Sequence, residues 1–100
     1  MAAKKSIIIT QTAQSQRLSI LAYWFDRLGH GRYSAVLARD FEHCLDLIQK
    51  FPQIGRKIQR TGYLGFTIRD FLIVYELTTN EIVIHQFWDL RQGPTSSVVQ

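Results

Sequence analysis

Five basic side chains in the second half of the chain are the residues best suited to act on a charged partner. Arg56, Lys57, Arg60 and Arg69 lie in a stretch without Asp or Glu, and Arg91 follows near the end of the sequence. Fixed cations hold phosphate groups, stabilise the charge that develops when a phosphodiester is cleaved, or bind an acidic protein. We predict that these five residues form one patch that binds the target, with an ordinary solvated loop as the simpler alternative.

Cleavage of a phosphodiester also needs a group that moves a proton, and His85 is the strand-borne candidate. A structural role is the alternative for a histidine within an apolar strand. After Arg91 the chain holds no Tyr, His, Lys or Asp that could take this role. The three histidines and one cysteine have no companions at metal-ligand spacing, so we expect neither a metal site nor a cofactor.

The helices and strands that must position these residues are predicted from the spacing of hydrophobic residues and from the residues typical of turns. A β-branched run over 6–10 reads as a strand, and three further strands are expected at 63–69, 71–78 and 81–88. A first helix begins after Thr10 or Thr12 and ends at Gly29. A second helix is capped by Ser34 and ends before Pro52. The predicted order is β-α-α-β-β-β.

Each helix carries an apolar stripe that predicts a buried face. The two stripes are Leu18, Leu21, Trp24, Phe25 and Leu28, and Leu37, Phe41, Cys44, Leu45 and Ile48. We therefore expect an α+β fold, a mainly antiparallel sheet with a helical hairpin packed on one face.

The length of 100 residues predicts one domain over 1–100, with its core at about 6–94 and a flexible tail at 95–100. The composition is 46% hydrophobic and 20% charged, which excludes a disordered chain. No apolar run approaches the roughly 20 residues of a membrane span, and no signal peptide is evident. These features predict a cytoplasmic protein that does not associate with membranes.

Three segments resemble the RelE/ParE toxin superfamily. The run LDLIQKFPQIGR at 45–56 is similar to that family's L..I...P..GR signature. The hydrophobic strand 71–75 ends in Tyr, and the strand 82–88 is followed by DLRQGP, as in the family's closing hairpin and its terminal W(D/H)-x-R-x-x-P element. The resemblance covers about residues 6–94 and agrees with the predicted order of elements.

The resemblance implies the toxin of a bacterial type II toxin–antitoxin system of the plasmid-stabilisation kind, neutralised by a cognate antitoxin. RelE-like members cut mRNA in the ribosome with basic residues and often a C-terminal Tyr or His, whereas ParE-like members poison DNA gyrase. Arg56, Arg69 and Arg91 match basic positions of the family, but the terminal acid–base residue is missing. This departure favours the ParE branch and argues against an enzyme.

Three hypotheses remain open. The leading one is a gyrase poison that binds its target through all five basic residues. A RelE-like ribosome-dependent mRNA endonuclease would instead use the set Arg56, Lys57, Arg69, Arg91 and His85. An inactive member would only bind its antitoxin. We expect an acidic and apolar antitoxin segment to cross the helices and the sheet and to form a hetero-oligomer with the toxin. Its contacts would be Leu21, Phe25, Leu72 and Val74.

Overall fold

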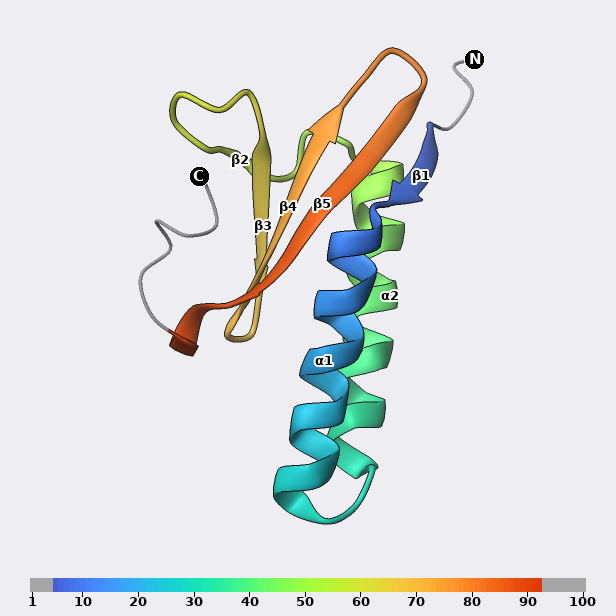
Figure 1. Ribbon diagram of the computed structural model, residues 1–100. Coiled ribbons are helices and arrows are strands. Elements are labelled where there is room, and N and C mark those ends of the chain that lie inside the picture. Colours follow the sequence, from blue (N-terminus) through green and yellow to red (C-terminus); the bar gives the residue numbers. More distant parts are fainter. Residues whose placement is uncertain (1–4, 93–100) are drawn as a thin grey trace.

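A computed structural model describes residues 5–92 (Figure 1). The elements are β1 (Ser6–Ile9), α1 (Gln11–Leu28), α2 (Arg32–Lys50), β2 (Arg56–Lys57), β3 (Leu64–Ile68), β4 (Phe71–Leu77), β5 (Glu81–Asp89) and the short 3-10 helix η1 (Leu90–Gln92). This order confirms the predicted one and adds β2, for which no strand was expected. The predicted tail at 95–100 and the last two residues of the predicted core lie outside the described residues.

The five strands form one sheet in the order β1-β5-β4-β3-β2. β1 runs parallel to β5, and the other neighbours are antiparallel. The two helices lie side by side and cover one face of this sheet (Figure 1). The expected mainly antiparallel α+β architecture is therefore confirmed. No helix within residues 5–92 is both long and apolar enough to span a membrane.

The ends of α1 follow the sequence signals. The Thr10 hydroxyl accepts a hydrogen bond from the Ala13 N–H at 3.1 Å and so satisfies one of the free donors at the start of the helix. At the other end, Gly29 adopts a left-handed conformation with φ of 73°, which a glycine takes without steric cost.

The start of α2 differs from the prediction. The helix begins at Arg32 after Gly31, and its cap makes no side-chain hydrogen bond. Ser34 lies inside the helix, where its hydroxyl donates to the Leu21 carbonyl of α1 at 2.7 Å. The serine therefore joins the two helices instead of capping one, because the short turn brings α1 within reach of its hydroxyl.

The core lies between the helical hairpin and the sheet. The predicted stripe of α2 is confirmed, since all five of its residues are buried. The Phe41 ring packs edge-on against Phe71 at 5.4 Å between centroids and lies 5.3 Å from the Phe87 ring. These aromatic contacts fix the hairpin on the central strands β4 and β5.

The predicted stripe of α1 is only partly correct. Leu18 and Phe25 are 55% and 52% exposed, and Leu28 is exposed as well. The buried side chains of α1 are Ala13 and Ile20. Leu21 and Trp24 of the predicted stripe are partly buried and pack against the core. The inward side of α1 therefore overlaps the predicted stripe but is shifted toward Ala13 and Ile20, because the helix packs against both α2 and β5.

Candidate functional site

Three of the five predicted basic residues lie at one edge of the sheet. Arg56 pairs with Gly65 and Lys57 with Leu64 of β3, and β2 is the last strand of the described sheet. Successive residues of a strand point to opposite faces, so Arg56 and Lys57 place one cation on each side of this edge. Arg60 follows in the loop, and all three residues are exposed. We call Arg56, Lys57 and Arg60 the basic edge.

The loop after β2 is held by its own hydrogen bonds. The Thr61 hydroxyl donates to the Ile58 carbonyl at 2.8 Å and accepts from the Tyr63 N–H at 3.0 Å. The Ile58 N–H donates to the Tyr63 carbonyl at 2.9 Å. Arg60 adopts a left-handed conformation with φ of 66°, which costs a residue with a Cβ about 1–2 kcal/mol. The hydrogen bonds of the loop offset this cost.

Two hollows flank the basic edge. The larger one, of about 670 Å³, is lined by Lys57 and Arg60 together with the amides of Gln53 and Gln59 and several apolar side chains. Arg56 lines the smaller one, of about 380 Å³. Within the described part of the chain, no side chain of the basic edge forms an ion pair. The three cations are therefore free to bind a ligand, although charges on an edge strand also discourage pairing with another sheet.

Arg69 lies at the opposite end of β3, in the two-residue turn to β4. Its Nε donates to Oδ2 of Asp40 on α2, and the hydrogen bond and charge of Asp40 raise the pKa of Arg69. The rise along a strand is about 3.3 Å per residue, so the four residues from Gly65 to Arg69 separate the two ends by roughly 13 Å. Arg69 is thus both distant from the basic edge and paired.

Arg91 is paired even more fully. Its Nε and Nη2 donate to the two carboxylate oxygens of Asp89 at 3.1 and 3.0 Å, and its backbone N–H donates to Oδ1 at 2.9 Å. The guanidinium lies 4.6 Å from the centroid of the Trp24 ring, a cation–π contact that fixes η1 against α1. Burial alone would raise the pKa of Asp89, but the hydrogen bonds from Arg91 outweigh it and lower that pKa.

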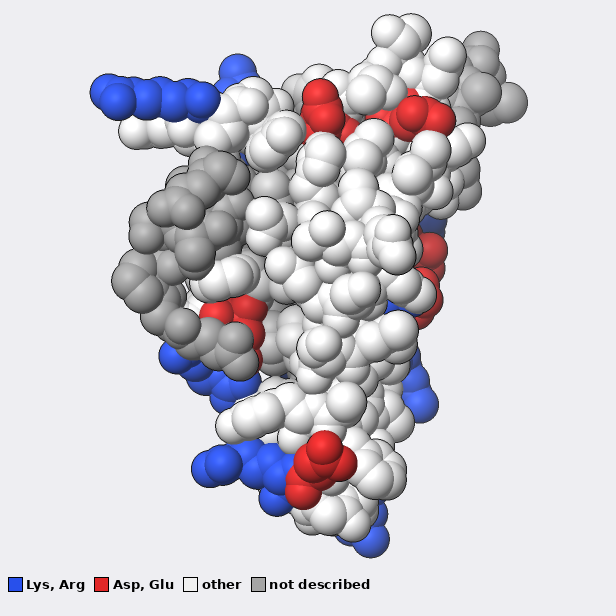
Figure 2. Space-filling model, in the orientation of Figure 1, with Lys and Arg blue, Asp and Glu red and all other residues white. Residues whose placement is uncertain are grey.

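The expectation of one basic patch is therefore wrong. The five residues divide into the basic edge at one end of the sheet and the paired Arg69 and Arg91 at the other. In Figure 2, basic side chains project beside the β2–β3 loop, and acidic groups lie further along the same end of the molecule. At the opposite end, acidic groups lie directly next to basic ones. The middle of that face, over α1 and β5, carries no charge (Figure 2).

His85 occupies a β-bulge on the face of the sheet that the helices leave open. Val74 pairs with Gln86 and Tyr75 with Ile84, which leaves His85 as the extra residue of β5. Its Nε2 is 2.9 Å from Oε1 of Glu76.

The His85 ring also stacks on Tyr63, with 4.7 Å between centroids. A carboxylate partner orients an imidazole for proton transfer. Glu76 was not predicted as this partner, because the bulge that aligns the two side chains leaves no distinct pattern in the sequence.

The four predicted antitoxin contacts do not form one surface. Phe25 is exposed and Leu21 partly buried, both on α1, whereas Leu72 and Val74 point away from the helices on β4. Val74 is only 1% exposed, so its side chain is not available as a contact. Leu72 and Val74 lie on the sheet face opposite the helices, so no single surface includes them together with the two α1 residues.

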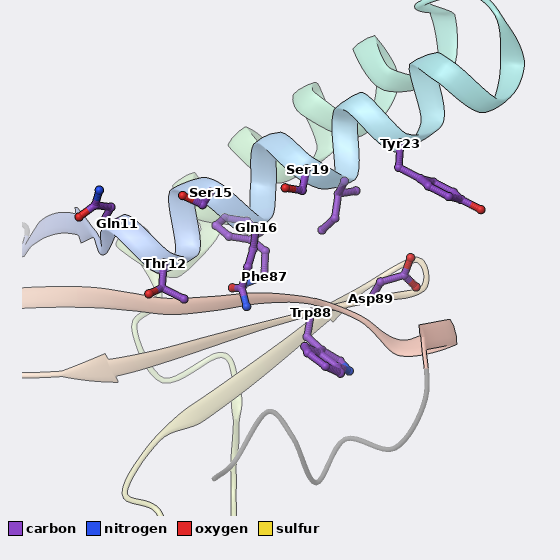
Figure 3. Close-up of a pocket in the computed structure, with 10 residues that line it drawn as sticks. Gln11, Thr12, Ser15, Gln16, Ser19, Tyr23, Phe87, Trp88 and Asp89 are labelled. Atoms are coloured by element: carbon purple, nitrogen blue, oxygen red, sulfur yellow. The ribbon is translucent and has the colours of Figure 1, made fainter.

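A groove that the sequence did not indicate lies between α1 and β5 (Figure 3). It measures about 520 Å³, and hydroxyl and amide groups of α1 line one side of it. β1 pairs only with residues 81–84 of β5, so the rest of this strand edge faces α1. There the side-chain oxygen of Gln16 accepts a hydrogen bond from the Phe87 N–H at 2.9 Å. It takes the position that the carbonyl of a neighbouring strand would otherwise occupy. The uncharged polar run 11–16 is the signal that could have pointed to this groove.

A model of the family "ParE toxin of type II toxin-antitoxin system, parDE" matches residues 7–92. The chain belongs to the ParE toxin family. No curated protein matches it. A solved structure described as the chromosomal ParDE TA system from P. aeruginosa contains a chain that is 16% identical, with a TM-score of 0.77. That match covers 87% of this chain and 97% of the other, and shows that the ParE fold described above has a counterpart among solved structures.

In this ParE family member, two of the three segments that carried the resemblance meet at one atom. The Tyr75 hydroxyl donates to the Pro52 carbonyl at 2.8 Å and accepts from the Gly55 N–H at 2.9 Å. A Cβ on Gly55 would lie 2.7 Å from that hydroxyl, so this close approach requires a glycine. The P..G part of the signature thus anchors the loop before β2 to the central strand and sets where the basic edge begins.

Proposed function

We propose that this type II toxin arrests growth in the cytoplasm by poisoning DNA gyrase, and that a cognate antitoxin neutralises it by covering its surface. The match to the ParE toxin family over residues 7–92 carries the proposal. Of the expected target-binding residues, the basic edge is free of ion pairs within the described chain, so we assign it the contact with the target. Arg69 and Arg91 then serve to hold the fold together.

The test uses the purified full chain with gyrase and plasmid DNA. Poisoning should inhibit supercoiling and accumulate cleaved plasmid after protein removal, and induction of the gene should arrest growth. An unrelated basic protein of similar size and charge controls for nonspecific binding to DNA. Unchanged supercoiling at micromolar toxin, without growth arrest, would sink the proposal.

A ribosome-dependent mRNA endonuclease is the second candidate, and the His85–Glu76 pair is the observation that favours it. This pair lies on the open face of the sheet and contacts Tyr63, at the end of the loop that carries Arg60. A translation reaction with a reporter mRNA separates the two functions. Mapped cuts that disappear with H85Q would replace the gyrase proposal, and intact mRNA would exclude the nuclease.

An inactive family member that binds only an antitoxin is the remaining alternative. It predicts harmless expression of the chain without any antitoxin gene. The same induction experiment therefore decides this point, because growth arrest contradicts an inactive member.

A further inference from the structure

The basic edge faces solvent without a compensating carboxylate. Between Asp46 and Asp70 the chain holds no acidic residue, and the lining of both flanking hollows contains none. Arg69 and Arg91 differ, because Asp40 and Asp89 neutralise them. Arg56, Lys57 and Arg60 therefore form a local group of cations without an ion pair among the described residues. Other exposed arginines without an ion pair in that part of the chain, such as Arg27, Arg32 and Arg39, lie on the helical hairpin.

The polar groups around these cations share one chemical character. In the larger hollow Lys57 and Arg60 are joined by the amides of Gln53 and Gln59 and by the Thr61 hydroxyl. The two cations and the two amides carry N–H donors, and no side chain of the five carries a negative charge. The Thr61 hydroxyl already donates to the Ile58 carbonyl. Such a lining suits a ligand that presents mainly acceptors, and phosphate oxygens are the usual acceptors for these residue types in DNA complexes. The positive charge of Lys57 and Arg60, with no carboxylate in the lining, favours an anionic ligand of this kind over an uncharged protein surface.

The positions of the cations favour a backbone over single bases. Arg56 and Lys57 straddle the edge strand, so one elongated ligand running along the edge meets both. Tyr63 and Phe66 are the aromatic residues that line the two hollows. The Tyr63 ring is already stacked on His85, and Phe66 packs against the core. Single-strand binders need free aromatic faces for stacking, so the geometry argues against single-stranded RNA.

We infer that the basic edge binds the phosphate backbone of duplex DNA. The inference deepens the proposed function and rests on it, since the DNA would be the segment that gyrase holds. Three phosphate contacts give a log–log salt slope of about −2.7, and nonspecific contacts of this kind have dissociation constants of roughly 10⁻⁴–10⁻⁶ M. Binding by the toxin alone is thus weak and strongly salt-dependent.

The experiment measures fluorescence anisotropy of a labelled 20-base-pair duplex, titrated with the full chain at several KCl concentrations. The test variant is R56Q/K57Q/R60G, where glycine suits the left-handed backbone of residue 60. The matched control is R27Q/R32Q/R39Q, which removes three exposed arginines of the helical hairpin and lowers the net charge equally, from +4 to +1. Circular dichroism melts check that both variants fold, and the single variant K57Q provides a milder change.

We expect the test variant to lose at least tenfold in affinity and most of its salt slope, and the control to lose less than threefold. K57Q should lie between wild type and the triple variant. Equal losses in test and control would overturn the inference, because net charge alone would then explain binding. Tighter binding of polyglutamate or of single-stranded RNA than of the duplex would also overturn it, by assigning the edge to another class of ligand.

A gyrase cleavage assay with the same variants separates this inference from the proposed function. If wild type poisons gyrase and the test variant poisons it equally well, the inference fails and the proposed function stands. If wild type binds the duplex through the basic edge but leaves gyrase unaffected, the DNA contact stands and the proposed function fails.

Discussion

Replacing Tyr75 with phenylalanine tests how the loop before β2 is held. The change removes a hydroxyl that donates to the Pro52 carbonyl at 2.8 Å and accepts the Gly55 N–H at 2.9 Å. A net hydrogen bond is worth about 0.5–1.5 kcal/mol, and the loss leaves two backbone groups in a partly buried place without this partner. We expect Y75F to lower the free energy of unfolding by about 2 kcal/mol, or the midpoint temperature by about 10 °C in a domain of this size.

Urea unfolding followed by circular dichroism measures this loss. Y23F is the matched control, because the Tyr23 side chain is exposed and its hydroxyl forms no hydrogen bond to any described residue. Y75F within about 0.5 kcal/mol of wild type, the range of ordinary surface changes, would refute the reasoning.

The pH dependence of Y75F gives a second measurement. Burial raises the pKa of Tyr75. In the unfolded chain a tyrosine ionises near pH 10. The unfolded state therefore loses its proton first, and the contribution of Tyr75 to stability, full below pH 10, falls as pH rises through the folded pKa. The stability of Y75F should decline less steeply over this range than that of wild type.

Gly55→Ala probes the same contact from the other side. The new Cβ would lie 2.7 Å from the Tyr75 hydroxyl and 3.0 Å from the Gly65 carbonyl oxygen. Overpacking of this kind costs about 1–3 kcal/mol. Part of that cost disappears when Tyr75 has no hydroxyl, so the losses of the two single variants should sum to more than the loss of the double variant. Strict additivity would show that the two residues act independently.

Three further predictions concern the paired and buried groups. In R91A the buried Asp89 loses its partner, which should cost about 2 kcal/mol after allowance for the exposure of Arg91. Acid unfolding followed by circular dichroism should move to higher pH in R91A. The reason is that the lowered pKa of Asp89 makes the pair stabilising above about pH 4, and this contribution is lost as pH falls through the folded pKa. Burial, reinforced by the charge of Asp40, raises the pKa of Cys44 to about 11, so alkylation should be slow in native protein and fast in urea. Because Arg69 has φ of 55°, R69A should be less stable than R69G by about 1 kcal/mol in urea unfolding, and the reverse order would contradict a strained turn.

The sequence predicted the order of elements because most boundaries rest on local chemistry. Thr10 and Gly29 act through bonds to their own helix, and the dense apolar run of β4 reads directly as a central strand. The stripe of α2 was also correct, since one face of this helix meets the sheet. The prediction that Phe25 lies on the buried face of α1 was wrong. This helix packs against both α2 and β5, and the spacing of its apolar residues does not tell which side of the helix faces these two elements.

The candidate site was less predictable because it depends on register and on pairing between distant residues. The order of the five basic residues in the sequence did not indicate that Arg56 and Arg69 would lie at opposite ends of β3. The carboxylate that neutralises Arg69 is Asp40, which lies 29 residues earlier on α2. The His85 bulge is likewise a property of two paired strands. Such features become visible only when long-range neighbours are known.

Most residues of the sequence signature that indicated the family serve to stabilise the fold. The signature therefore shows that the chain belongs to the family but does not show which target the protein binds. Leu45 and Ile48 are buried, while Pro52 and Gly55 are bound by the Tyr75 hydroxyl. These positions explain why the chain adopts the ParE fold, because they are engaged in core packing and in internal hydrogen bonds. Arg56 is the member of the signature that faces solvent without an ion pair among the described residues. Evidence that the chain belongs to the family is therefore independent of evidence that it binds gyrase. Experiments on target binding should address the basic edge, which begins at Arg56.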